Sequence, residues 1–323
     1  MEKNIPIRLG IIGLGAMGSE MFRAAIDHPE FRVTYCADID SNNIMRLKSE
    51  FPSIKFTQSP FELIESNEVD AVYIAVPPDF HAVYSVRSMI HNKAVFCEKP
   101  LTVNLSDGMT MIMAATETKM VNVVNFPFAD RHAVYEIERA IKEGEVGNIM
   151  GVEIRLLFPE WPRKFQAKAA WLSTRTQGGF IREVFSHFVY LTDRILSPLT
   201  PVFVRLDHTP EDFLTSEVNA SGLFYSGNVP VKLNALSGAA IPETYEWNLY
   251  GSKRSYSIRN WDELYQSDGT GWQSVTLHQQ RGTEKTRLTL FAKAIRGEQH
   301  NLPDFAVGFR VARIIESFHQ SIT

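Results

Sequence analysis

Residues 7–18 read IRLGIIGLGAMG, and the architecture of the first part of the chain follows from this run. An apolar, β-branched stretch leads directly into Gly13, Gly15 and Gly18, with a helix expected to begin near Met17. In this spacing the first glycine permits a tight turn, the second lets the backbone approach a pyrophosphate, and the third lets the helix lie close to the strand. The helix N-terminus then faces the phosphates. The run therefore predicts the first strand, turn and helix of a dinucleotide-binding parallel sheet.

From this run to about residue 126, apolar stretches alternate with segments of helical period. Strands are predicted at 7–12, 31–38, 54–57, 69–76, 94–99 and 121–126, and helices at 17–27, 42–51, 61–66, 80–91 and 105–119. This alternation is typical of a doubly wound parallel sheet covered by helices, the α/β Rossmann arrangement. Residues 1–126 are therefore predicted to be an NAD(P)-binding domain.

The pattern changes after a predicted helix that starts near residue 132 and ends at Gly144. Strands of alternating polarity are expected at 149–158, 202–207, 217–226, 229–238, 245–253, 254–260 and 272–278, and helices at 180–196, 284–295 and 305–321. The pattern predicts an α+β domain over residues 127–323 with a large, mostly antiparallel sheet. One face of this sheet is expected to join copies of the chain into a homodimer or homotetramer.

Composition narrows the classes of partner. The 323 residues carry 33 Lys+Arg and 37 Asp+Glu, a net charge of -4, so nucleic acid is not an expected partner. Cys36 and Cys97 are too few for a disulfide framework and are predicted to be buried thiols. The 9 histidines show no metal-ligand spacing, so no metal is expected. No apolar run reaches the length of a membrane span, and no leader peptide is recognisable, so a cytoplasmic location is predicted.

Asp38 ends the second predicted strand, 20 residues after Gly18. An acidic residue at this distance accepts hydrogen bonds from the ribose hydroxyls of a dinucleotide. Ile39 follows it, where a 2′-phosphate would call for a small residue and an arginine, and the carboxylate itself would repel that phosphate. NAD is therefore expected in preference to NADP.

Two further strand ends reach the same edge of the predicted sheet, because ligands of open parallel sheets lie beyond the strand carboxyl ends. One strand ends before Pro77, ahead of a predicted helix that carries His81, and the next ends in Glu98-Lys99-Pro100. The residues predicted to contact the cofactor are Gly13, Leu14, Gly15, Ala16, Met17, Gly18, Asp38, Val76, Pro77, Pro78, His81, Glu98, Lys99 and Pro100.

The predicted helix after Gly178-Gly179 carries Glu183 and His187 four residues apart, so an α-helix would present both on one face. Tyr190 follows three residues later and is expected to adjoin them. Trp171 precedes the two glycines and is expected to reach the substrate. This helix face is the predicted catalytic wall of the second domain.

Taken together, the glycine turn, Asp38, the Glu98-Lys99-Pro100 element and the helix with His187 resemble the glucose-fructose oxidoreductase / inositol 2-dehydrogenase / MocA family. The resemblance implies a dehydrogenase or reductase that transfers a hydride between a nicotinamide and a polyhydroxylated carbonyl or alcohol, such as a sugar, a sugar derivative or a cyclitol. The chain departs from similar proteins where it has Glu183, Phe185 and Tyr190, since they usually have Asp, Gly and often Asp there.

Roles follow for the predicted catalytic residues Lys99, His187 and Glu183. Lys99 is expected to stabilise developing alkoxide charge, and His187 to give or take the proton, from opposite sides of the substrate. Glu183 is expected to bind substrate hydroxyls or orient His187. The predicted substrate contacts are Lys99, Asn125, Trp171, Glu183, His187 and Tyr190.

Three alternatives stay open on the sequence alone. The chain could bind the dinucleotide as a sensor with little turnover, or reduce an imine or an unusual keto sugar in a more apolar pocket, because Phe185 and Tyr190 are bulky. The basic cluster Arg163-Lys164 could receive a substrate carboxylate or phosphate, although a solvated loop is the favoured interpretation.

Overall fold

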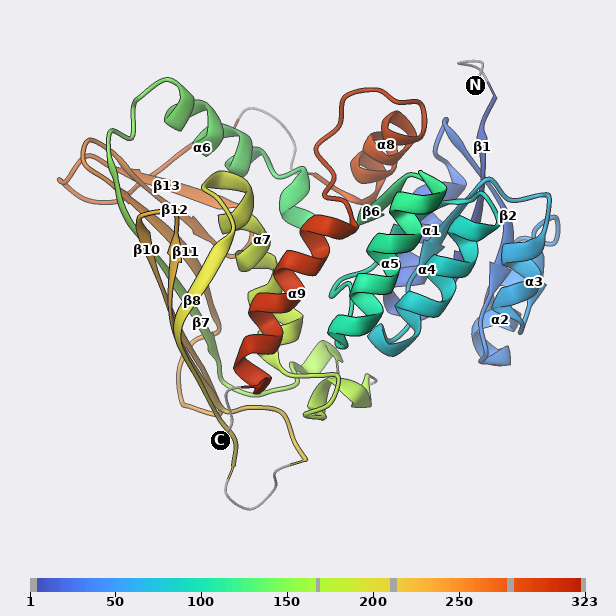
Figure 1. Cartoon of the computed structure of the whole chain (residues 1–323), viewed down its shortest axis with the longest axis horizontal. Helices are drawn as coiled ribbons and strands as arrows, with labels where there is room; N and C mark the ends of the chain where they lie inside the picture. The colour runs from blue at the N-terminus through green and yellow to red at the C-terminus, as the bar shows by residue number, and fades with distance from the viewer. Residues whose placement is uncertain (1–4, 167–168, 210–213, 278–281, 321–323) are drawn as a thin grey trace. The chain divides into compact units, whose positions relative to one another are not determined.

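The computed structural model describes residues 5–166, 169–209, 214–277 and 282–320. Within these ranges, residues 5–129 and 282–309 form one compact unit, and the described residues of 130–277 together with 310–320 form the second. Figure 1 colours the chain by residue number and labels the elements used below. Each unit is described by itself.

Unit 1 is built on a parallel sheet with the strand order β3-β2-β1-β4-β5-β6. The strands are β1 (Ile7–Ile12), β2 (Phe31–Ala37), β3 (Lys55–Thr57), β4 (Ala71–Ile74), β5 (Ala94–Cys97) and β6 (Asn122–Val124). The helices are α1 (Ala16–Ile26), α2 (Ser41–Lys48), α3 (Pro60–Glu65), α4 (His81–Ile90), α5 (Leu105–Thr118) and α8 (Glu284–Ile295). The strand order reverses between β1 and β4, which is where doubly wound sheets bind ligands beyond the strand carboxyl ends. The predicted fold class of this part is confirmed.

Helix α8 belongs to unit 1, although it lies far along the chain. Phe291 stacks on Phe31 of β2 at 6.0 Å between ring centroids and lies 5.1 Å from Phe96 of β5. The backbone N–H of Val124 in β6 donates to the carbonyl of Pro303 at 2.8 Å. The predicted assignment of all residues from 127 to 323 to one domain therefore differs from the structure at residues 282–309. Periodicity identified this helix, but the partner of its apolar face is decided by long-range packing.

Unit 2 contains an eight-stranded sheet with the order β14-β13-β12-β11-β7-β10-β9-β8. The strands are β7 (Ile149–Phe158), β8 (Leu199–Asp207), β9 (Asn219–Ser226), β10 (Val229–Ser237), β11 (Thr244–Gly251), β12 (Ser255–Arg259), β13 (Glu263–Ser267) and β14 (Gln273–Ser274). All neighbouring strands pair antiparallel except β7 and β10. The expected large, mostly antiparallel sheet is confirmed. The sequence analysis missed β13, and β14 is shorter than the predicted strand 272–278, whose last residue lies outside the described residues.

Helices cover one face of this sheet with apolar side chains. They are α6 (His132–Lys142), α7 (Ser186–Ile195) and α9 (Phe305–Gln320), of which α9 begins in the segment that belongs to unit 1. Trp247 of β11 is fully buried and donates its indole N–H to Thr192 Oγ1 of α7 at 3.0 Å. Phe318 of α9 lies 6.0 Å from Phe224 of β9. The other face carries polar pairs such as Arg155 with Glu246, 3.1 Å apart. This distribution is what alternating strand polarity predicts.

Several general features follow from the described residues. Cys36 and Cys97 are buried free thiols, as predicted, and burial raises the pKa of both. None of the described helices combines the length and apolarity that a membrane span requires. Within the described ranges, no three side chains of His, Cys, Asp or Glu come together in a way that could hold a metal ion.

Candidate active site

The glycine turn between β1 and α1 has the local geometry that its spacing predicts. Gly13 has a φ of +89°, and a side chain there would overlap the carbonyl of Ala75. A side chain at Gly18 would overlap the carbonyl of Gly13, so this glycine lets α1 lie against the strand end. Gly15 is the N-cap of α1, and a Cβ there would meet no atom within 4 Å. The turn thus leaves open space at the one glycine whose backbone is expected to approach a pyrophosphate.

Asp38 follows β2 and is bonded directly to this turn. Its Oδ2 accepts a hydrogen bond from the backbone N–H of Leu14 at 2.6 Å, and its Oδ1 accepts one from the N–H of Asp40 at 2.8 Å. The carboxylate is therefore held rigidly beside the turn. Oδ2 also accepts a hydrogen bond from Asn43 Nδ2 at 3.1 Å, so the acceptor capacity that remains for a ribose hydroxyl lies on Oδ1. These residues fit a dinucleotide.

Arg46 of α2 is a neighbour of the turn that the sequence analysis missed. Its Nη2 donates to the carbonyl of Leu14 at 3.0 Å and to Ser19 Oγ at 2.6 Å. The sequence around Arg46 does not indicate a contact with the glycine turn, because that contact depends on how α2 packs beside the turn. The guanidinium adds positive charge where Asp38 adds negative charge.

The strand end after β4 differs in detail from the prediction. Val76 and Pro77 are half-buried and Pro78 is buried. His81 is 0% exposed, and its ring nitrogens lie 2.9 Å from the carbonyl of Val76 and 3.0 Å from that of Pro100. Burial holds the pKa of His81 below its ordinary value. The imidazole of His81 therefore connects the loop after β4 with the loop after β5, and it is buried between them instead of facing the cofactor.

Glu98 lies behind Lys99 in a buried polar cluster. Its Oε1 accepts hydrogen bonds from the hydroxyl of Tyr73 and, at 2.6 Å, from Nδ2 of Asn125, while its Oε2 accepts one from the N–H of Lys99 at 3.3 Å. Burial raises the pKa of Glu98, and these donors together with the charge of Lys99 oppose that rise. Lys99 itself is half-buried, and Pro100 is buried. Asn125, predicted as a substrate contact, is bonded inside unit 1.

In unit 2, the helix that carries the predicted catalytic face begins as a π-helix over Ile181–Phe185 and becomes α7 at Ser186. Glu217 Oε1 accepts a hydrogen bond from the N–H of Ile181 at 2.7 Å, and Gly179 has a φ of +96°. The predicted helix is present, but its first turn is wider than an α-turn. Short π-segments of this kind occur frequently at functional sites.

Glu183 faces a loop of the same unit. Its Oε1 accepts a hydrogen bond from Gln166 Nε2 at 3.0 Å and lies 3.6 Å from a guanidinium nitrogen of Arg163. Arg163 is only 9% exposed and donates to the hydroxyl of Tyr245 at 2.8 Å. The favoured interpretation of Arg163 as part of a solvated loop is therefore wrong, because carboxylate, hydroxyl and aromatic partners enclose it. Lys164 remains exposed beside Glu160.

His187 is buried against Trp261, a residue that the sequence analysis missed. The ring centroids are 5.1 Å apart and the rings are perpendicular. Trp261 lies in the turn between β12 and β13 with a φ of +75°, which is rare for a bulky residue. Tyr245 lies 5.0 Å from Trp261 and also bonds Arg163. Tyr245 therefore links the partners of Glu183 to those of His187.

The remaining predicted substrate contacts of unit 2 lie in different surroundings. Tyr190 is buried, and burial raises its pKa to about 12 although the nearby Arg194 opposes the rise. Arg194 in turn pairs with Glu138 of α6 at 2.7 Å. The charged groups near Tyr190 are therefore Arg194 and Glu138 of α6, and not Glu183. Trp171 is half-buried in a short 3-10 helix over Ala170–Ser173.

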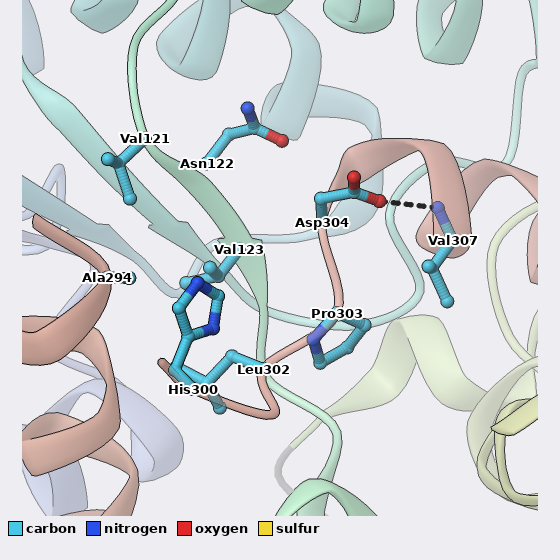
Figure 2. Close-up of a pocket in the computed structure, with 9 residues that line it drawn as sticks. All are labelled: Val121, Asn122, Val123, Ala294, His300, Leu302, Pro303, Asp304 and Val307. Carbon is cyan, nitrogen blue, oxygen red and sulfur yellow. Dashed lines mark hydrogen bonds between the residues drawn. The ribbon is translucent and has the colours of Figure 1, made fainter. Parts of the chain in front are cut away.

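A cavity of about 340 Å³ opens elsewhere in unit 1, beside the edge strand β6 (Figure 2). It is lined by Val121, Asn122, Val123, Ala294, His300, Leu302, Pro303, Asp304 and Val307. Asp304 Oδ1 accepts the N–H of Val307 at 2.9 Å and so caps the first turn of α9. None of the predicted site residues lines this cavity.

Two family models match the chain. One, described as an oxidoreductase family with an NAD-binding Rossmann fold, matches residues 7–126. The other, described as the GFO/IDH/MocA C-terminal domain, matches residues 134–257. The first covers the glycine turn, Asp38 and Lys99, and the second covers the segment with Glu183 and His187.

Curated relatives match part of the chain. Myo-inositol 2-dehydrogenase of Thermotoga maritima is 30% identical over 147 residues, which are 44% of this chain and 42% of that protein. 2,7-anhydro-N-acetylneuraminate hydratase of Escherichia coli is 28% identical over 174 residues, which are 54% of this chain and 45% of that protein. The chain thus spans less than half the length of these relatives.

Solved structures match the fold over nearly the whole chain. A levoglucosan dehydrogenase in complex with NADH has a TM-score of 0.86 at 19% identity and covers 98% of this chain and 97% of its own. A 3-ketoreductase from Actinomadura kijaniata, in complex with NADP and TDP-benzene, has a TM-score of 0.82 at 19% identity, with 98% of each chain covered. At this identity the likeness concerns the fold.

Proposed function

Since the chain belongs to the glucose-fructose oxidoreductase / inositol 2-dehydrogenase / MocA family of oxidoreductases, we propose that it is a nicotinamide-dependent dehydrogenase or reductase. Its substrate would be a polyhydroxylated alcohol or carbonyl compound, such as a sugar, a sugar derivative or a cyclitol. The observation that carries the proposal is the rigid pairing of Asp38 with the open glycine turn, in the same unit as the Glu98-Lys99 strand end.

We propose NAD rather than NADP as the cofactor. The support is the carboxylate of Asp38, held beside the turn, which would accept a ribose hydroxyl and repel a 2′-phosphate, while Arg46 beside the same turn already donates to Leu14 and Ser19. The residues that would hold the group are the glycine turn, Asp38 and the loops after β4 and β5. When bound, the nicotinamide supplies or accepts the hydride.

The cofactor preference is tested by titrating the protein with NADH and NADPH and following fluorescence. NADH is expected to bind about tenfold more tightly, since repulsion between the Asp38 carboxylate and a 2′-phosphate is expected to cost about 1.4 kcal/mol where Arg46, already bonded to Leu14 and Ser19, does not offset it. Asp38→Ala should remove this difference. Asp40→Ala is the matched control, because Asp40 lies in the same loop and caps α2. Equal affinities in the parent protein would refute the assignment of NAD.

The proposed chemistry uses one lysine and one histidine. The ammonium of Lys99 would donate a hydrogen bond to the reacting oxygen and stabilise its negative charge as the carbonyl is reduced. The imidazole of His187 would deliver the proton to that oxygen, and in the oxidative direction it would take the proton away. Glu183, held by Gln166 and Arg163, would accept hydrogen bonds from neighbouring substrate hydroxyls.

Substrate-dependent absorbance change of NADH across a panel of sugars, cyclitols, keto acids and imines tests this proposal. With the best substrate, Lys99→Ala should lower kcat by more than about tenfold, because one oriented donor to an oxyanion contributes about 10²–10³ to the rate. Lys93→Ala is a control at the other end of β5, since Lys93 bonds the carbonyls of Ser66 and Val69 instead. A kcat of Lys99→Ala within about tenfold of the parent would exclude the role given to Lys99.

The surroundings of Phe185 bear on the two alternative functions, a reductase with a more apolar pocket and a dinucleotide-binding sensor. Phe185 is fully buried and lies 5.9 Å from Phe224 and 5.8 Å from Phe318, so its bulk fills the core between helix and sheet. The departures at Phe185 and Tyr190 therefore give little support to a more apolar substrate pocket. Tight NADH binding without turnover on the whole panel would instead favour a dinucleotide-binding sensor. Assembly through the sheet of unit 2 and a cytoplasmic location stay predictions.

A further inference from the structure

Helix α4 of unit 1 carries apolar side chains on its outer face. Val83 is 45% exposed and Ile90 is 56% exposed, whereas Ser85 and Ser88 are fully buried on the inner face of the same helix. A surface helix ordinarily buries its apolar side chains and exposes its polar ones. At these four positions α4 has the opposite polarity. Exposed apolar side chains that lie together in this way indicate a surface that another molecule covers.

The exposed side chains of α4 line an open groove of about 620 Å³. Helix α4 packs between α3 and α5, which supply the two sides of the groove (Figure 1). Phe61 of α3 is 42% exposed, and its ring centroid lies 5.7 Å from that of Tyr84 of α4. On α5, Thr110 lines the groove, and the exposed Met113 follows it by three residues and so adjoins it. An exposed apolar surface therefore extends over α3, α4 and α5.

The charged residues of the groove are mostly acidic. They are Glu65, Asp79, Arg87 and Asp107. Arg87 pairs with Glu65, with 2.5 Å between Nη2 and Oε1. Asp79 and Asp107 form no ion pair with any residue that the structure describes. The groove therefore combines an apolar floor with two carboxylates that have no cationic partner.

This combination selects among the possible occupants of the groove. A second copy that docked through the same groove would bring carboxylates against carboxylates, and an anionic membrane surface would also be repelled. A partner with lysine or arginine beside apolar side chains matches both features. At a rise of 1.5 Å per residue, the 10 residues of α4 and the 14 residues of α5 are about 15 and 21 Å long. A groove between such helices accommodates another helix of three to four turns.

We propose that the groove formed by α3, α4 and α5 binds a basic amphipathic helix of a partner protein. The apolar side chains of that helix lie on Val83, Val86 and Ile90. Its lysine or arginine side chains pair with Asp79 and Asp107. The interaction does not involve hydride transfer, so it is independent of the proposed catalytic function.

The test uses a synthetic peptide as the probe. The peptide has about 14 residues, or four turns, with leucines on one helical face and lysines on the other, and it carries fluorescein. Fluorescence anisotropy during titration with the full chain, at physiological salt, should show saturable binding of one peptide per chain. A second peptide with glutamate in place of every lysine should bind at least about tenfold more weakly, because like charges then meet.

Two variants of the groove are compared with two matched controls. Ile90→Lys places a cation on the apolar floor and should raise the Kd at least about tenfold. Met45→Lys is its control, because Met45 is 59% exposed on α2 and does not line the groove. Asp107→Lys replaces attraction by repulsion and should also raise the Kd at least about tenfold. Glu50→Lys, at an exposed position outside the groove, changes the net charge equally. Both controls should leave the Kd within about twofold, since salt screens distant exposed charges.

Thermal unfolding midpoints equal to that of the parent show that the variants fold. The proposal is wrong if the parent does not bind the lysine peptide, or if it binds the glutamate peptide equally well. An unchanged Kd in Ile90→Lys or in Asp107→Lys also overturns it, as does an equal loss of affinity in the controls. Sedimentation velocity tests the other occupant: if the parent self-associates and Ile90→Lys prevents this, a second copy fills the groove and the proposal is refuted.

Discussion

Gly179 shows how a single residue shapes the candidate site of unit 2. Its φ of +96° is in the left-handed region, and a Cβ there would overlap the carboxylate of Glu217. Glu217 in turn holds the first N–H of the π-helix that carries Glu183. The glycine therefore provides both a backbone conformation and the space that the carboxylate occupies.

We expect Gly179→Ala to lower the free energy of unfolding of unit 2 by about 2–4 kcal/mol, from left-handed strain plus the overlap. Gly144→Ala is the matched control. Gly144 has a φ of +73°, but a Cβ there meets nothing within 4 Å, so its cost should be only the strain of about 1 kcal/mol. Urea unfolding of both variants, followed by tryptophan fluorescence, gives the comparison. Equal losses would contradict the proposed overlap.

Trp261 presents a second case of strain at residue scale. Its positive φ costs about 1–2 kcal/mol, yet it brings the indole against the imidazole of His187. We expect Trp261→Phe to retain most activity and Trp261→Ala to lower kcat more than it changes NADH binding. Steady-state kinetics and the fluorescence titration separate the two quantities. A parallel loss of both would indicate a general disturbance of the fold.

At the scale of elements, the π-helix and α7 depend on one buried acid. Glu217 is almost fully buried, and burial raises its pKa to about 7, while the N–H of Ile181 opposes the rise. The unfolded chain loses this proton near the ordinary glutamate pKa of ~4.3. Between these two values the folded state binds more protons, so the stability of unit 2 falls as the pH rises from about 4.5 to 7.

We therefore expect Glu217→Gln to remove this fall, because a neutral amide keeps an oxygen for the N–H of Ile181 and carries no buried charge. At about pH 8 the variant should be about 2–3 kcal/mol more stable relative to its parent than it is at about pH 4.5. Urea unfolding at the two pH values measures the difference. A pH-independent difference between variant and parent would show that Glu217 titrates normally.

At the scale of the whole molecule, two separate segments of the chain, one early and one late in the sequence, make up unit 1. Residues 282–309 return to it and bring α8 against the sheet, while the rest of α9 belongs to unit 2. Apolar side chains on these late segments therefore stabilise different units, although they are close in sequence. Phe291 packs on unit 1, and Phe318 packs on Phe185 and Phe224 of unit 2.

We expect Phe291→Ala to destabilise unit 1 by about 3–5 kcal/mol and Phe318→Ala to destabilise unit 2 by a similar amount, since both rings are fully buried. Hydrogen exchange followed by mass spectrometry resolves the two units peptide by peptide. Phe291→Ala should speed exchange in β2 and β5, and Phe318→Ala in β9. Faster exchange of unit 2 strands in Phe291→Ala would contradict the division of the chain.

Local patterns were sufficient for most elements of both units. The strand 7–12 and the helix 284–295 were predicted with the observed bounds, and the helix 105–119 to within one residue. The glycine turn and Asp38 were also identified, because turn chemistry and strand polarity depend on neighbours in sequence. β13 was missed since its side chains, of which only Leu264 is buried and only Glu263 fully exposed, give no clear alternation.

The sequence by itself thus determined the kinds of element, their order, and the glycine turn with its acid. Only the tertiary structure decided that α8 returns to unit 1, that Arg163 is enclosed beside Glu183, and that Arg287 reaches Glu98 through Asn125. The physical reason is the distance along the sequence over which each effect acts. Propensity and periodicity act over a few residues, whereas Arg163 meets Tyr245 across 82 residues and Arg287 meets Asn125 across 162, through packing that no short pattern records.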